Sequence, residues 1–170
     1  MPIAVDYRTL AFNTTLIGDS GKYIGRSAYW KLYAIENLTR ILVHSVLSAQ
    51  ISPAWWAVAI DPDTNRQVQK TKKSYAKQPW HSAPGGHDIY YLFLPDLRKI
   101  IFTHSHLFRP IIPDIDAWIL RIEDIRLPRN IVGHMNWLNV ADEHQIDSTY
   151  SDMKALIRRL SQSGITLTIP

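Results

Sequence analysis

The segment SAYWKLYAIENLTRILVHSVLSAQ, at residues 27–50, decides the fold of this chain. It contains neither Gly nor Pro, and its apolar residues spread well beyond one narrow stripe of a helix. That distribution is typical of a helix that is buried on most sides. We therefore predict a helix from Ser27, whose side chain is a suitable N-cap, to the residues before Pro53.

The flanking segments are less regular than this helix. Residues 1–26 carry three glycines without a sustained periodicity, so we expect an irregular arm with a short strand at Ile3–Val5. After the turn signal Asp61-Pro62-Asp63, residues 66–77 contain five basic residues and no acid. That composition predicts either an exposed helix or a mobile linker, and Pro and Gly between residues 78 and 88 predict a loop.

Further helices are expected in the second half of the chain. One should begin near Asp88 or after Pro95, with Asp96 as a possible cap, and end before Pro110 and Pro113. The next should be capped by Asp114 and kinked or restarted at Pro128.

The last helix should run from Ser148 or Thr149 to Gly164, and alternation through Ile165–Ile169 predicts a short strand. Together these patterns predict an all-α bundle of four to five helices over residues 27–160, between an N-terminal arm (1–26) and a C-terminal tail (161–170).

Composition limits the class of protein. A chain of 170 residues that is 46% hydrophobic suits one domain with one core. It has no cysteine, which excludes disulfides, thiolate metal sites and cysteine nucleophiles and is compatible with a cytoplasmic location. Because no apolar run approaches about 20 residues, we expect no membrane span. A net charge of +4 mildly favours a polyanionic partner.

The motif that carries chemistry is Arg129-Asn130-Ile131-Val132-Gly133-His134. An arginine can hold a phosphate bidentately at any pH, and a histidine can donate or accept a proton near neutrality. Chance predicts roughly 0.02 copies of Arg-Asn-x-x-x-His in a chain of this composition, so the motif is moderately specific. On a continuous helix Asn130 and His134 share a face with Arg126, whereas Arg129 lies about 140° from His134. Distortion at Pro128 or a second protomer would then have to complete a site.

In its ordered motifs the chain resembles the HEPN superfamily. These motifs are Ile35–Arg40, Trp55-Trp56, Pro79–His81, Ile89–Leu92, Asp96–Ile101, Ile122–Ile125 and Arg129–His134, and they span residues 27–160. The resemblance implies an all-α homodimer in which the Arg and His motifs of two protomers meet in one cleft. It implies a metal-independent endoribonuclease that needs no cofactor and leaves a 2′,3′-cyclic phosphate and a 5′-hydroxyl. It also implies RNA as a partner and a toxin–antitoxin, phage-defence or RNA-processing setting, with an antitoxin or other protein as a possible further partner. Gly133 replaces an alanine common in this family.

The resemblance assigns roles to individual residues. His134 would be the acid and base, Arg129 the phosphate binder and Asn130 the positioning residue. Arg126, Glu36 and Arg40 are expected to contribute to substrate binding. For Glu36 two interpretations stand, a helical i, i+4 pair with Arg40 or a carboxylate that faces the cleft and either orients Arg129 or tunes His134 by its charge.

Several alternatives stay open from the sequence. A non-catalytic HEPN module that binds RNA or a protein is the second functional hypothesis. The basic run at 66–77 is either a solvated face or an RNA phosphate track. Trp55-Trp56 suits core or interface packing better than base stacking, and no ligand spacing around His81, His87, His104 and His106 predicts a metal site.

Overall fold

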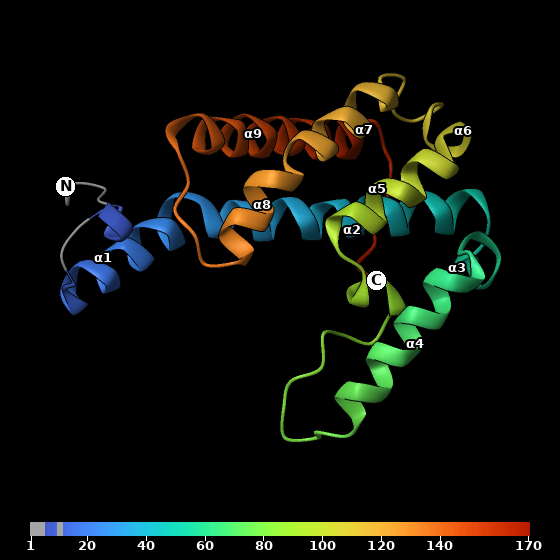
Figure 1. Ribbon diagram of the computed structural model, residues 1–170. Helices are drawn as coiled ribbons and strands as arrows, with labels where there is room; N and C mark the ends of the chain where they lie inside the picture. Colours follow the sequence, from blue (N-terminus) through green and yellow to red (C-terminus); the bar gives the residue numbers. More distant parts are fainter. Residues whose placement is uncertain (1–5, 10–11) are drawn as a thin grey trace.

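The structure, a computed structural model, describes residues 6–9 and 12–170, and within these ranges every regular element is helical (Figure 1). The predicted all-α class is confirmed. The α-helices are α1 (Thr14–Ile24), α2 (Trp30–Gln50), α3 (Trp55–Ala59), α4 (Pro62–Ala76), α5 (Leu94–Thr103), α6 (Ser105–Phe108), α7 (Ile115–Asp124), α8 (Arg126–Gly133) and α9 (Val140–Gln162). Two 3-10 turns, η1 (Tyr7–Thr9) and η3 (Asp88–Tyr91), and a π-helical turn, η2 (Gly25–Tyr29), complete them.

Helix α2 is the centre of the bundle. It packs along α9 and against α5 and α6, and α5 in turn packs on α7 (Figure 1). Its buried side chains include Ile35, Val43 and Leu47, each fully withdrawn from solvent. Removing such side chains from water contributes roughly 1.5–3 kcal/mol apiece. The predicted burial of this helix on most sides is therefore confirmed.

The irregular arm predicted for residues 1–26 is wrong for its second half, where α1 runs directly through η2 into α2. The Asn13 side chain caps α1 by accepting hydrogen bonds from the backbone N–H groups of Thr15 and Leu16. The far end of α1 is anchored at Tyr23, whose hydroxyl donates to Glu143 on α9 over 3.0 Å. Ser27 lies inside the π turn instead of capping a helix. The strand predicted at Ile3–Val5 lies outside the described residues.

The basic segment forms helix α4, so the linker interpretation is wrong. Asp61 caps it by accepting the Thr64 N–H over 2.9 Å, and Pro62 occupies the first turn, where no N–H is needed. Val68 is the only residue of α4 that is buried. The helix packs against η3 and extends away from the bundle as an arm (Figure 1).

Helices α7 and α8 meet at a break that the sequence predicts. Asp114 occupies the N-cap position of α7, and α8 restarts at Arg126 with Pro128 in its first turn. The missing N–H of proline is harmless there because first-turn N–H groups have no partner within the helix. The restart is confirmed, and α8, which carries Arg129, runs in a different direction from α7.

Helix α9 begins eight residues before the predicted start at Ser148. Asn139 caps it by accepting the Asp142 N–H over 2.8 Å, and Asp142 accepts the Asn139 N–H in return. Its end at Gly164 is confirmed. That residue has a φ of 78°, and the Ile165 N–H donates to the Leu160 carbonyl over 3.1 Å in a Schellman motif.

The strand predicted at Ile165–Ile169 is wrong: these residues form no strand, and residues 6–9 and 12–170 offer none for them to pair with. It runs beside α2, whose backbone groups are already bonded within the helix. The tail is held by side chains instead. The Thr168 N–H donates to Ser45 Oγ over 2.8 Å, and the Tyr90 hydroxyl donates to the Pro170 carbonyl over 3.3 Å.

Candidate functional site

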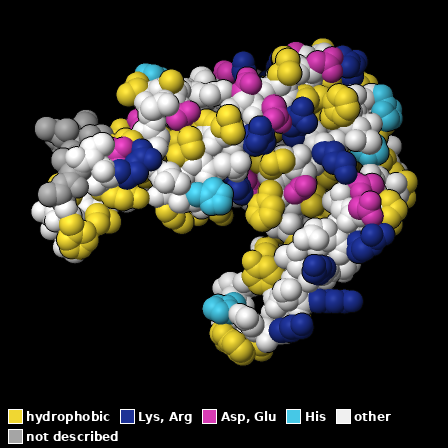
Figure 2. Space-filling model, viewed as in Figure 1, with side chains coloured by type: hydrophobic (Ala, Val, Ile, Leu, Met, Phe, Trp, Pro, Cys, Tyr) yellow, Lys and Arg dark blue, Asp and Glu magenta, His cyan; other side chains and the backbone are white. Residues whose placement is uncertain are grey.

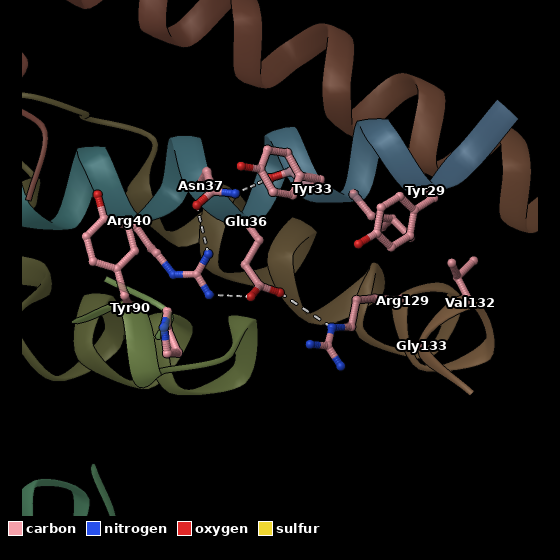
Figure 3. Close-up of a pocket in the computed structure, with 11 residues that line it drawn as sticks. Tyr29, Tyr33, Glu36, Asn37, Arg40, Tyr90, Arg129, Val132 and Gly133 are labelled. Atoms are coloured by element: carbon pink, nitrogen blue, oxygen red, sulfur yellow. Dashed lines mark hydrogen bonds and ion pairs between the residues drawn. The ribbon is translucent and has the colours of Figure 1, made fainter. Parts of the chain in front are cut away.

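An open cleft of about 450 Å³ lies between α2 and α8 (Figure 3). The loop before η3 closes one end of it. The lining residues come from these segments and from η2 and η3: Tyr29, Leu32, Tyr33, Glu36, Asn37, Arg40, Pro84, Tyr90, Arg129, Val132 and Gly133. The cleft thus contains one arginine of the sequence motif, together with a wall of α2 that is unusually polar for a central helix.

The spacing of residues on α2 explains this polar wall. On this helix the polar positions recur at intervals of three, four and seven residues and form one stripe: Tyr33, Glu36, Asn37 and Arg40. Tyr29, the last residue of η2, extends the stripe. The two tyrosines are 57% and 65% exposed, whereas Arg40 is 8% exposed. The stripe therefore has exposed tyrosines at one end and a buried arginine at the other.

Arg40 closes the cleft at its deep end. It donates to the Leu92 carbonyl over 2.7 Å, to Asn37 Oδ1 over 3.0 Å and to Glu36 Oε1 over 2.5 Å. These bonds tie α2 to the segment before α5. Both terminal nitrogens of Arg40 are thus bonded to the protein itself, whereas its buried Nε has no partner among the described residues. Arg40 therefore lines the deep end of the cleft as a support for Glu36.

Glu36 divides its carboxylate between two guanidinium groups. Oε1 accepts from Arg40, and Oε2 lies 3.4 Å from Arg129 Nε (Figure 3). The i, i+4 pair with Arg40 and the contact with Arg129 therefore exist together, whereas His134 lies outside the cleft that Glu36 lines. Two guanidinium groups against one carboxylate leave one net positive charge at the cleft, which suits a single phosphate.

Arg129 is held at the mouth of the cleft. Besides Glu36, its guanidinium lies over the Phe93 ring, 5.2 Å from the centroid, in a cation–π contact. A methyl group at Gly133 would stand 3.6 Å from Arg129 Nη1, an ordinary van der Waals distance. The glycine in the motif is therefore not required by the position of the arginine.

His134 ends α8 and is exposed, but it does not line the cleft. Its N–H donates to the Asn130 carbonyl over 2.9 Å, and the Asn136 N–H donates to the Ile131 carbonyl over 2.9 Å. This Schellman-type end places Met135, with a φ of 58°, in the left-handed conformation that favours glycine. A non-glycine residue in this conformation costs about 1 kcal/mol and fixes the backbone beside His134.

The remaining predicted residues lie away from the cleft lining. Asn130 is half-buried on α8. Arg126 Nε donates to Glu123 over 2.8 Å, and Arg98 Nε lies 3.0 Å from the other oxygen of the same carboxylate. Hydrogen bonding from Arg126 lowers the pKa of Glu123. The structure therefore brings Arg129, Glu36 and Arg40 together and leaves Arg126, Asn130 and His134 outside that group.

Sequence reasoning missed the aromatic part of the site. Tyr29 and Tyr33 are assigned no role from the sequence, although their recurrence with Glu36 and Arg40 marks a separate stripe. Phe93 carries no local signal, because its contact with Arg129 joins residues far apart in the chain.

Further properties bear on ligands and partners. Within residues 6–9 and 12–170, no group of three histidine or acidic side chains is arranged to hold a metal ion. No helix in the described part of the chain is both long and apolar enough to cross a bilayer. No protein-family model matches this chain, and no curated protein or solved structure is significantly similar to it.

Proposed function

We propose that this chain is a metal-independent endoribonuclease of the HEPN type, with an active site completed by a second copy. One observation carries the proposal. A single short helix presents Arg129 to a cleft of net positive charge and ends in the exposed His134. These are the two groups that cleavage of an RNA phosphodiester requires, a phosphate binder and a proton carrier.

The reaction would use the RNA as its own nucleophile. The 2′-oxygen attacks the adjacent phosphorus while its proton passes to a base, and the bond from phosphorus to the 5′-oxygen breaks as that oxygen takes a proton from an acid. The products are a 2′,3′-cyclic phosphate and a 5′-hydroxyl. Arg129 would stabilise the charge on the phosphoryl oxygens, with Glu36 fixing the direction of its guanidinium.

A second copy is proposed because His134 lies outside the cleft that Arg129 lines. Its exposure leaves it accessible to the cleft of another protomer. Two such helices related by a twofold axis would bring His134 of each copy to Arg129 of the other, as the acid and base of that site. The proposal implies a cytoplasmic enzyme, and in a toxin–antitoxin pair the antitoxin would cover this cleft.

The test is cleavage of a fluorescent single-stranded RNA with and without EDTA, beside the same strand with 2′-deoxy sugars. We expect cleavage that survives EDTA, a 2′,3′-cyclic end on the product and no cleavage of the deoxy strand. His134→Ala should lose at least about 100-fold in rate with unchanged circular dichroism, and the exposed His144→Ala serves as its matched control. Cleavage at the wild-type rate by His134→Ala would refute the assignment.

A non-catalytic HEPN module that binds RNA or a protein is the second candidate. The pairing of Arg129 with Glu36 and the position of His134 outside the cleft favour it. Under this hypothesis the wild-type protein binds RNA without cleaving it, and His134→Ala binds with the same affinity.

A further inference from the structure

Helix α4 carries a continuous row of positive charge on its outer face. Arg66, Lys70, Lys73 and Lys77 follow one another at intervals of four, three and four residues, which places them on one side of a helix. All four are exposed. At 1.5 Å per residue the row is about 16 Å long, which matches a few consecutive phosphates of an extended strand.

The charge of this row is not neutralised within the chain. Lys72 lies on the other side of α4, and its ammonium group is 2.5 Å from the Asp88 carboxylate. It therefore does not belong to the row. Arg66 contacts Asp63 at 3.0 Å, but these side chains are 77% and 85% exposed, and such a pair is weak in water. Lys70, Lys73 and Lys77 have no carboxylate partner among the described residues.

An uncovered aromatic side chain lies just past the end of the row. Trp80 is 75% exposed in the loop that follows α4. Figure 2 shows the basic side chains projecting from the arm, with hydrophobic and histidine side chains gathered at its lower end. A large indole that buries little of its surface is available for stacking, and stacking on an aromatic ring is sequence-tolerant for single-stranded nucleic acids.

The same loop leads back to the cleft. Pro84 lines the cleft, and the backbone at Gly85 lies so close to the Tyr90 ring that an added Cβ would stand 2.5 Å from it. Tyr90 is itself part of the cleft lining. The chain therefore connects the cationic row, Trp80 and the Arg129 cleft in that order.

We propose that the outer face of α4 with Trp80 is a docking surface for single-stranded RNA, which it guides toward the Arg129 cleft. The inference rests on the proposed ribonuclease function. Charge complementarity selects a polyanion, and the exposed indole selects one with unpaired bases over an acidic peptide or a duplex, whose bases are already stacked. An anionic membrane is a poorer occupant, because Tyr75 is the one large apolar side chain that α4 leaves exposed, whereas a helix that lies in a membrane surface needs a broad apolar face.

Binding is measured apart from cleavage, by fluorescence anisotropy on a fluorescein-labelled 20-nucleotide RNA with 2′-deoxy sugars at the bonds that are cut. The variant Lys70→Gln/Lys73→Gln/Lys77→Gln is compared with Lys22→Gln/Lys154→Gln/Arg158→Gln, which removes equal charge from exposed sites on α1 and α9. We expect the α4 variant to bind about 100-fold more weakly at 0.1 M salt, with a slope of log K against log salt smaller by about 2. The control should change both quantities far less.

Trp80 is tested by a second pair of variants. Trp80→Ala should weaken binding about tenfold without changing the salt slope, and Trp80→Phe should restore most of the affinity. Duplex RNA of the same length should bind without any effect of Trp80→Ala.

The outcomes separate this inference from the proposed function. Equal binding by the α4 and control variants overturns the docking surface even if the protein cleaves RNA, and so does a preference for phosphatidylserine vesicles or polyglutamate over the strand. Weakened binding confined to the α4 and Trp80 variants supports the surface even if the wild-type protein cleaves nothing.

Discussion

Glu36 is the residue on which the geometry of the cleft depends. Its carboxylate is shared between Arg40, which is buried, and Arg129, which stands at the mouth. A carboxylate bound on both sides by guanidinium groups fixes the direction of both. Arg40 and Arg129 therefore differ in their expected contribution to stability, although they contact the same carboxylate.

The first prediction separates support from function at this residue. Glu36→Ala should lower the free energy of unfolding by about 3 kcal/mol, because it leaves the Arg40 charge buried without its carboxylate. Arg129→Ala should cost about 1 kcal/mol or less, because Glu36 keeps Arg40 and the lost side chain is partly exposed. Urea denaturation measures both, with Arg66→Ala as an exposed control. An equal cost for the two variants would make Arg129 a structural residue.

At the scale of residues, the sequence indicates those features of the cleft that have a local signal. Arg129 follows from the motif, and the Glu36–Arg40 pair follows from its i, i+4 spacing. The contact between Glu36 and Arg129 and the Phe93 ring under Arg129 depend on how α2, α5 and α8 pack, which no short pattern encodes. The position of His134 outside the cleft has the same origin, because it depends on where α8 ends.

At the scale of elements, helix ends decide where the sequence-based prediction holds. The break at Pro128 and the end at Gly164 were predicted because proline and glycine act through their own backbone. The start of α9 was missed because its capping box uses Asp142 where glutamate or glutamine is usual. Helix α1 was missed because its glycines lower helix propensity, and the contact that anchors it joins Tyr23 to the distant Glu143.

The second prediction tests the start of α9. Asn139→Ala should lower the free energy of unfolding by about 1 kcal/mol through loss of the cap. Ser148→Ala should be neutral or slightly stabilising, because Ser148 lies exposed inside the helix, where alanine is the better helix former. Thermal denaturation distinguishes the two, and a larger loss for Ser148→Ala would move the helix start to that residue.

The third prediction concerns the junction of α2, α3 and the segment before η3, where His44 and His87 lie 5.0 Å apart between ring centroids. Trp55 Nε1 donates to His44 Nδ1, and the Ile89 N–H donates to His87 Nδ1, each over 3.1 Å, so both rings are held in their neutral forms. Burial lowers the pKa of both histidines. The neighbouring His87 lowers that of His44 further, while at His87 Asp88 opposes the shift and Lys72 adds to it.

Because the folded pKa values lie below the unfolded value of about 6.5, the unfolded state binds more protons in between. Stability from this pair is present above about pH 6.5 and is lost as the pH falls below it. The melting temperature of the wild type should therefore drop between pH 7.5 and 5.5, and His44→Gln should flatten that dependence. The exposed His144→Gln is the control and should follow the wild type; identical curves for all three would contradict the prediction.

At the scale of the whole molecule, the fourth prediction concerns assembly. If each site takes Arg129 from one copy and His134 from the other, Arg129→Ala and His134→Ala proteins are each inactive, yet a mixed dimer has one complete site. Random exchange should then restore about a quarter of the wild-type sites. RNA cleavage by the equimolar mixture, after dilution and reassembly, measures this. A mixture as inactive as its components would place both groups within one chain.

The arm formed by α4 gives the molecule an extended outline that composition does not predict. From the sequence, the basic run at 66–77 is either a solvated face or a phosphate track. In the folded chain it forms the outer face of an arm that extends from the bundle. The all-α class could be predicted because apolar residues recur at helical spacing in α2, α7 and α9. Their mutual arrangement depends on contacts between distant segments.

The π-helical turn at Gly25–Tyr29 determines how far α1 is rotated about the helix axis relative to α2. Each residue advances an α-helix by about 100°, so one residue more or less at this turn rotates everything before it relative to everything after it. Tyr29 belongs to the cleft and Tyr23 to the anchor on α9, and the turn sets the angle between them. Deleting Gly25 would keep both tyrosines but turn the Tyr23 hydroxyl away from Glu143. The orientation of α1 relative to α2 and the cleft therefore depends on the number of residues in this one turn.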